Sequence, residues 1–396
     1  MARAALGLGG VWVHEHRTTA EAAKVRARQR QALAVVGARS ALGVRLQARL
    51  CAEEDYHAGR HASILTSLAE ARSTGDPVAV AEALNLAHHC LMDPAHQALR
   101  LELAHELIGQ AAWTGRRGDL VIGLLWRTVD LFLAGDAHAE RSLAELRGLL
   151  TDKDHQAAGF VVAVIDVMLA IRAGRLAQAE ALAAACAERG QTAGDADALG
   201  WYGAQLAAIR WYQGRIGELV PALSELVKSP ELGTADHAYF PALAVAAATA
   251  GDQRLARGTL ARLGDLALLP RTKSWLAAMH GVAEAAYLLD DVEIASQVYA
   301  LLLPFARLPA IAGLGVACFG STHHALGMAS LTADKPIGRS NTCARPSRPT
   351  SRWTTGPPRP CHDGGWPRPW PSTADWGTQR RADTRPRQSR RPRSWA

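Results

Sequence analysis

The chain has 396 residues, of which 48% are hydrophobic and 20% are charged. This composition supplies ample apolar material for a folded core and excludes a chain that is disordered throughout. The mean hydropathy is −0.04, and no apolar run reaches the ~18–20 residues that a membrane-spanning helix needs. We therefore expect no transmembrane helix and no membrane partner.

Residues 1–17 form an N-terminal segment with glycines at positions 7, 9 and 10. A dinucleotide-binding loop needs a third glycine three residues after the second, and that spacing is missing here. We interpret the segment as a flexible or capping stretch. A helix is predicted from Thr18 or Thr19 to Val36, and it opens a helical domain that we place at 18–333.

Helix–turn–helix hairpins recur through this domain with a period of about 39 residues. The predicted turns are Gly59, Pro94, Gly135, Gly174, Gly214, Gly251, Asp290 and Thr332. Two helices per unit at this spacing are typical of tetratricopeptide-like arrays. Because one hairpin cannot cover its own apolar face, neighbouring hairpins must stack. The sequence thus predicts an all-α fold, a right-handed α-solenoid of tetratricopeptide-like hairpins.

The clearest hairpin runs from Val161 to Arg189. Its first helix has apolar residues at helical spacing, including Val164, Ile165 and Met168. Gly174 ends that helix, since glycine readily adopts the left-handed conformation of a C-cap. At the far end of the domain we expect one helix over Ile311–Ser330, with no following helix to cover it.

The candidate partner or ligand surface comprises Trp201, Arg210 and Trp211, on the concave face that such arrays use for binding. Aromatic residues at this spacing also fit a helix core, so both interpretations stay open. His57 and His61 have the i, i+4 spacing of a metal site but lie on either side of the predicted turn at Gly59, and no nucleotide-binding or nucleophile motif is present. We expect no metal, no cofactor and no enzymatic activity. The six cysteines are scattered without a C-x-x-C pair, which favours a reducing cytoplasm.

Composition changes abruptly after about residue 333. Residues 334–396 contain 11 of the 19 prolines and five of the 11 tryptophans, with no Leu, Val or Phe. Such a tail is predicted to be disordered. Arginine interleaved with tryptophan can bind single-stranded nucleic acid, or the tract can be a linker. We favour a third interpretation, a tail translated from a shifted reading frame.

Three blocks of sequence are similar to a known group of proteins: ALGLGGVWVHEHRTT at 5–19, EALNLAHHCLMDPAH at 82–96 and GLLWRTVDLFLAGD at 123–136. They resemble the tetratricopeptide-like region of large actinobacterial transcriptional regulators that contain an ATPase, of the LuxR-type and AfsR-like (SARP) groups. The resemblance covers about residues 3–333. It implies a sensor or scaffold segment, without the nucleotide-binding and DNA-binding motifs of those regulators.

Taken together, these features predict a non-catalytic helical-repeat segment of a transcriptional regulator, truncated with respect to its parent. It would bind a protein partner or a small ligand on its concave surface. The alternative is a nucleic-acid-binding protein that acts through the basic tail.

Overall fold

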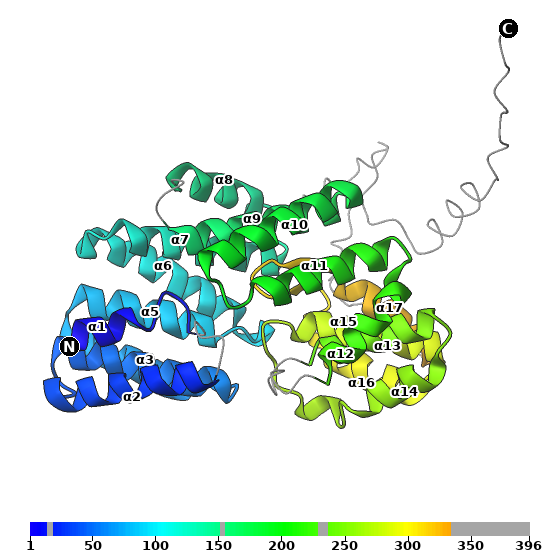
Figure 1. Ribbon diagram of the computed structural model, residues 1–396, viewed down its shortest axis with the longest axis horizontal. Helices are drawn as coiled ribbons and strands as arrows, with labels where there is room; N and C mark the ends of the chain where they lie inside the picture. The colour runs from blue at the N-terminus through cyan, green and yellow to red at the C-terminus, as the bar shows by residue number, and fades with distance from the viewer. Residues whose placement is uncertain (14–18, 151–154, 229–236, 334–396) are drawn as a thin grey trace, which may run out of the picture. The chain divides into compact units, whose positions relative to one another are not determined.

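The computed structural model describes residues 1–13, 19–150, 155–228 and 237–333. All of them belong to the first of two units into which the chain divides, Met1–Pro346. The described residues are mostly helical, as predicted (Figure 1). The predictions made for residues 334–396, including disorder and nucleic-acid binding, lie outside this range.

Eight helices build the first half of the unit. They are α1 (Ala2–Gly7), α2 (Thr19–Val36), α3 (Ala41–His57), α4 (Ala62–Thr74), α5 (Pro77–Cys90), α6 (Gln97–Thr114), α7 (Arg117–Ala134) and α8 (Ala139–Leu149). Each helix from α3 to α7 contacts the next along the chain, and α5 also contacts α3 and α7. First helices of successive hairpins therefore lie against one another.

The second half continues with α9 (Gln156–Arg172), α10 (Leu176–Ala193), α11 (Ala198–Tyr212), α12 (Val220–Leu226), α13 (Tyr239–Thr249), α14 (Gln253–Ala261), α15 (Trp275–Leu289), α16 (Val292–Leu302) and α17 (Thr322–Thr332). Short 3-10 turns lie at Pro94–His96, Ile216–Leu219, Leu266–Leu268 and Leu303–Phe305. No described helix is long and apolar enough to cross a bilayer.

Most of the predicted hairpin turns are confirmed. The glycines at 59, 135, 174, 214 and 251 all have positive φ angles, as has Asp290 at 51°. A left-handed residue lets the chain reverse directly after a helix. At Pro94 the turn is a 3-10 helix, where the Asp93 carboxylate accepts a hydrogen bond from the Ala95 amide.

The hairpin of α9 and α10 forms the expected apolar contact. Val161, Val164, Ile165 and Met168 of α9 are all buried, and Ala179, Ala183 and Cys186 of α10 are buried as well. Small residues on α10 allow the two helices to approach closely, as at Gly190. A Cβ atom there would lie 2.6 Å from the Phe160 ring.

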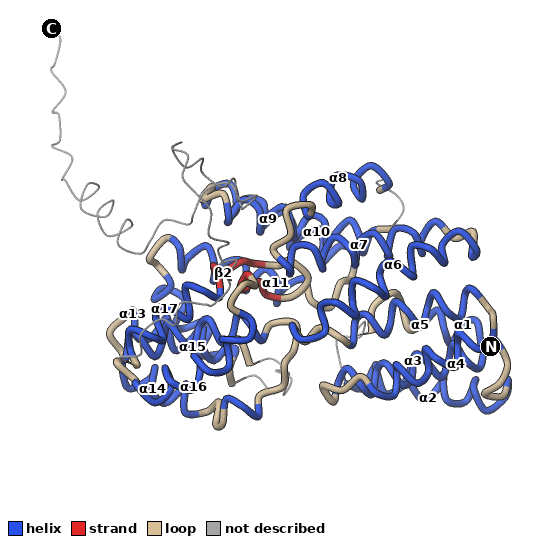
Figure 2. The backbone as a smooth tube through the Cα atoms, turned by 180° about the vertical axis from the view of Figure 1, so that it is seen from behind, coloured by secondary structure: helices blue, strands red, loops and turns tan. Residues whose placement is uncertain are grey.

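The predicted single helix over Ile311–Ser330 is wrong in its first half. This region contains two antiparallel strands, β1 (Pro309–Ala312) and β2 (Ala317–Ser321), and α17 starts only at Thr322 (Figure 2). Gly313 and Gly315 have positive φ angles of 62° and 89° between the strands. Glycines within a short apolar run favour a hairpin, and the periodicity of such a run does not separate a helix from a strand. The fold is therefore mostly, but not entirely, α-helical.

The β-hairpin packs back onto the middle of the array. It contacts α7, α9, α11 and α15, and the Gln205 side chain donates to the Val316 carbonyl oxygen at 3.4 Å. The Tyr212 hydroxyl donates to the Cys318 carbonyl oxygen at 3.3 Å. Leu314 and Val316, which the sequence placed on an uncovered helix, are buried for this reason.

We predict that Gly315→Ala destabilises the unit by about 1–3 kcal/mol, because a non-glycine residue is strained at this φ and its Cβ would overlap Ile165. The Cβ position lies 2.9 Å from Ile165 Cγ1. Urea unfolding would measure the difference. Gly148→Ala, at an α8 position with no atom within 4 Å of the new Cβ, is the control. Equal midpoints for the two variants would contradict this packing.

Candidate functional site

A pocket of about 440 Å³ opens in the first half of the unit. Its walls come from α1, α3, α5, the middle of α6, the start of α7 and the start of α9. Four arginines face it: Arg3, Arg45, Arg49 and Arg116. The other polar lining residues are Glu82, Asn85, Asp119 and His155. Apolar side chains complete it, including Leu6, Val11, Leu86, Leu107 and Ile122.

The residues after α1 form one wall, and Arg49 of α3 holds them in place. Its guanidinium donates to the carbonyl oxygens of Trp12 at 2.5 Å and of Gly10 at 2.6 Å. Gly9 makes this approach feasible, since a Cβ atom there would lie 2.9 Å from Arg49 Nε. The glycine cluster, which the sequence left as a flexible or capping stretch, thus has a close-packing role at Gly9.

Asn85 of α5 ties the same segment to the helices beneath it. Its side-chain amide donates to the Val11 carbonyl oxygen at 2.9 Å, and its oxygen accepts from Trp126 Nε1 at 2.7 Å. The Trp12 ring meets Trp126 edge-on, with centroids 5.6 Å apart. These contacts join the N-terminal segment, α5 and α7 into one aromatic and polar cluster.

A buried charge network contacts this cluster through the His88 ring, which stacks on Trp126. The Asp130 carboxylate of α7 accepts from Arg100 Nε and faces His88 Nε2, both at 2.7 Å. The His88 ring also stacks on Trp126 at 4.2 Å between centroids. All three charged or polar side chains are almost completely buried. Because a buried charge is costly unless paired, the network fixes α5, α6 and α7 relative to one another.

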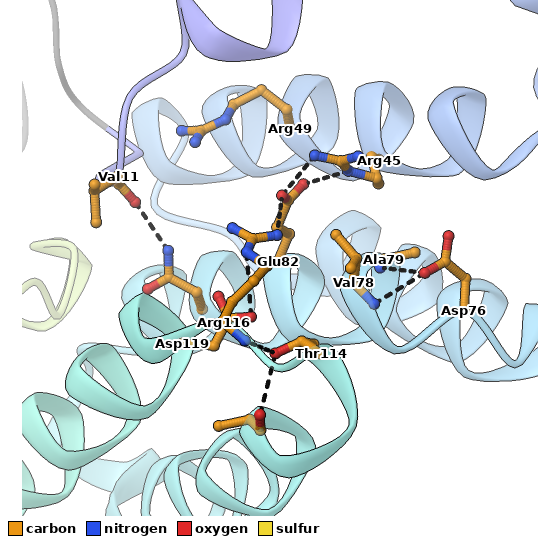
Figure 3. Close-up of polar contacts among 12 residues, drawn as sticks. Val11, Arg45, Arg49, Asp76, Val78, Ala79, Glu82, Thr114, Arg116 and Asp119 are labelled. Atoms are coloured by element: carbon orange, nitrogen blue, oxygen red, sulfur yellow. Dashed lines mark hydrogen bonds and ion pairs between the residues drawn. The ribbon is translucent and has the colours of Figure 1, made fainter. Parts of the chain in front are cut away.

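Charged groups form a chain across the pocket (Figure 3). Arg45 donates to both Glu82 oxygens at 2.7 Å, a bidentate ion pair. Arg116 donates to the same Glu82 at 3.1 Å and lies 3.5 Å from Asp119. Burial raises the pKa of Asp119, while Thr114 and Arg116 act in the opposite direction. Arg3 makes no ion pair within the described part of the chain.

Four arginines against two carboxylates leave the pocket with excess positive charge. Guanidinium groups bind carboxylate, sulfate and phosphate groups through several parallel hydrogen bonds. The apolar wall opposite suits a hydrocarbon or aromatic body. The arrangement can bind an organic anion; no pair of groups in it has the geometry of a nucleophile and its base.

The three residues singled out from the sequence lie elsewhere, on α11. Trp201 is 8% exposed and stacks on Phe160, with ring centroids 5.2 Å apart. Arg210 forms ion pairs with Glu180 and Glu218. Trp211 meets Phe319 of β2 edge-on at 5.4 Å. Each is engaged within the fold, and the β-hairpin lies against this helix.

Trp211 also contacts an acid with an altered pKa. Burial raises the pKa of Glu284 on α15 to about 7, and a hydrogen bond from Trp211 acts in the opposite direction. Nearby His280 has a pKa lowered to about 3 by burial and by His324. These groups share the interior between α11, α15 and the β-hairpin.

Sequence reasoning missed the pocket because its lining residues are spread from Arg3 to Ala158. One signal was present. The three blocks on which the family resemblance rests contact one another beside the pocket, through Trp12 of the first, Asn85 and His88 of the second, and Trp126 and Asp130 of the third. The first two blocks also line the pocket, at Val11 and Asn85, whereas no residue of the third does. Among the described residues no group of three or more His, Cys, Asp or Glu side chains can hold a metal ion.

No protein-family model, curated protein or solved structure matches this chain. The resemblance to actinobacterial regulators therefore stays a prediction, and the pocket is interpreted from its own chemistry.

We predict that Asn85→Leu lowers the free energy of unfolding by about 1–3 kcal/mol, because it leaves the buried Trp126 N–H without an acceptor. It should also expose the N-terminal segment to trypsin. Denaturant unfolding and limited proteolysis measure the two effects. Gln178→Leu, at an exposed position of α10, is the control. Unchanged stability and proteolysis of Asn85→Leu would contradict the bridging role.

A second prediction concerns pH. Because the pKa of Glu284 is raised from 4.5 to about 7, the folded state loses stability relative to the unfolded state as pH rises through this interval. Glu284→Gln removes the loss, so its stability relative to the wild type should increase from pH 5 to 7 and level off above about pH 8. The expected gain is on the order of 2 kcal/mol.

Urea unfolding at several pH values measures that difference, and other titrating groups cancel in the comparison. Glu293→Gln, at an exposed position of α16, should show no such trend. A pH-independent difference between Glu284→Gln and the wild type would refute the assignment.

Proposed function

We propose that this chain is a non-catalytic helical-repeat module that binds a small organic anion in the arginine-lined pocket. The observation that carries the proposal is the pocket itself, in which four arginines and two carboxylates face an apolar wall. A volume of about 440 Å³ lies in the range of small-molecule sites.

The biological setting we propose is a sensor segment of a cytoplasmic transcriptional regulator. It rests on the three sequence blocks and on the stacked hairpins, whose right-handed solenoid geometry and 39-residue period belong to the same proposal. Two of the three blocks line the pocket, at Val11 and Asn85, and this supports a link between the resemblance and ligand binding. A protein partner on the concave surface and nucleic-acid binding by the tail are the alternatives from sequence.

Ligand binding is expected to need the charge of Arg3. This side chain is exposed at the pocket and makes no ion pair among the described residues, so its removal should leave the fold intact. We expect octanoate to bind with one-to-one stoichiometry and octanamide, of equal length and no charge, to bind much more weakly. Arg3→Gln should weaken octanoate binding about tenfold, equivalent to about 1.4 kcal/mol.

Isothermal titration calorimetry measures these affinities. Arg141→Gln, which removes an exposed arginine of α8 that does not line the pocket, is the matched control and should bind as the wild type does. Equal affinity for octanoate and octanamide, or equal losses in both variants, would contradict an anion site in this pocket.

A further inference from the structure

The charges that line the pocket do not balance. The charged lining side chains are four arginines and two carboxylates, namely Arg3, Arg45, Arg49, Arg116, Glu82 and Asp119. With the histidine of the lining neutral, positive charges therefore exceed negative charges by two. A ligand with two negative charges balances this lining, whereas a monoanion leaves one positive charge without a counter-charge.

Both carboxylates of the pocket are engaged within the protein. Glu82 accepts two hydrogen bonds from Arg45, at 2.7 Å each, and one from Arg116, at 3.1 Å (Figure 3). Asp119 lies 3.5 Å from the same Arg116. These four side chains form a chain of alternating charge that is neutral as a whole. The carboxylates are thus compensated before any ligand enters, and the excess positive charge of the lining comes from the remaining arginines.

The remaining arginines are Arg3 of α1 and Arg49 of α3. Arg3 is exposed and makes no ion pair within the part of the chain that the structure describes. Arg49 donates to the carbonyl oxygens of Trp12 and Gly10, and so holds its guanidinium at the wall of the pocket.

Two helices also begin at the pocket. Gly118 in the first turn of α7, and Ala157 and Ala158 in the first turn of α9, line it. Neither N-cap residue, Arg116 or His155, makes a side-chain capping hydrogen bond. The first amide groups of a helix have no acceptor within the helix, and they lie at the positive end of its dipole. Both helix ends therefore add to the positive potential that the arginines produce.

Resting on the proposed function, we propose that the pocket selects a doubly charged head group and that its ligands are phosphate monoesters with an apolar body. A phosphate group places both charges on one head group and offers three acceptor oxygens to guanidinium donors. Its body is left for the apolar part of the lining, which includes Leu86, Leu107 and Ile122. A dicarboxylate of equal total charge has a charged group at both ends and no apolar end to bury.

Octyl phosphate and octyl sulfate test this directly by isothermal titration calorimetry. Both have the same chain and a tetrahedral head group, but at pH 8 the phosphate carries nearly two charges, since its second pKa is about 6. The wild type should then bind octyl phosphate about tenfold more tightly than octyl sulfate. At pH 5, where the phosphate carries mostly one charge, the two affinities should be nearly equal. Octanedioate should bind more weakly than octyl phosphate at pH 8.

Three variants connect this preference to the charge of the pocket. Arg3→Gln removes one positive charge from the lining and should lower the ratio of the two octyl affinities at pH 8 about threefold. Arg3→Lys keeps the charge and should keep the ratio. Arg141→Gln, which removes an exposed arginine outside the lining, should also leave it unchanged. Circular dichroism would verify that each variant is folded.

Equal affinities at pH 8, or a preference for octyl sulfate, would overturn the selection of a dianion while leaving the anion site standing. A preference for octyl phosphate that persists at pH 5, or that a folded Arg3→Gln retains in full, would overturn it as well. Tighter binding of octanedioate would overturn the assignment to phosphate monoesters. If Arg3→Gln does not fold, the wild-type ratios at the two pH values decide. Failure of the wild type to bind either octyl anion refutes the proposed anion site, and with it this inference.

Discussion

Two antiparallel helices can bury only part of their apolar surface against each other, and the whole structure depends on this constraint. The remaining apolar surface must be covered by the next pair, and so α3, α5 and their successors stack through their first helices. Residues with positive φ angles, most of them glycines, set where most pairs reverse. The pocket lies between these stacked helices, and the β-hairpin packs against four of them.

Two non-helical segments fill that space in different ways. The β-hairpin of Pro309–Ser321 packs its apolar residues against α9 and α11, and its Phe319 contacts Trp211, one of the three residues that sequence reasoning assigned to ligand binding. The residues after α1 instead lie across α3 and α5 and are held mainly by polar contacts from Arg49 and Asn85. The first segment closes a surface, whereas the second forms one wall of a pocket.

The charge arrangement of this pocket differs from that of the paired surface charges elsewhere. Pairs such as Arg72–Glu106 are exposed and self-contained, and contribute little to stability. In the pocket, Glu82 is shared by two arginines, while Arg3 has no carboxylate partner within the described ranges. An unequal distribution of this kind is expected of a site that binds a charged ligand. The buried pairs of Asp130 with Arg100 and His88 connect α5, α6 and α7, three of the helices from which the pocket's walls come.

The amino-acid sequence by itself determined the helical hairpins and nearly all of their turns, because helix periodicity and turn glycines act over a few residues. It did not determine the strands at 309–321, since a short apolar run with glycines fits either structure until its partners are known. The pocket was decided by tertiary structure alone. Arg3, Arg45, Glu82 and Arg116 look like ordinary surface charges in sequence, and only stacking brings them together. Equally, burial removed Trp201 from the surface, because its stacking on Phe160 depends on how α11 lies against α9.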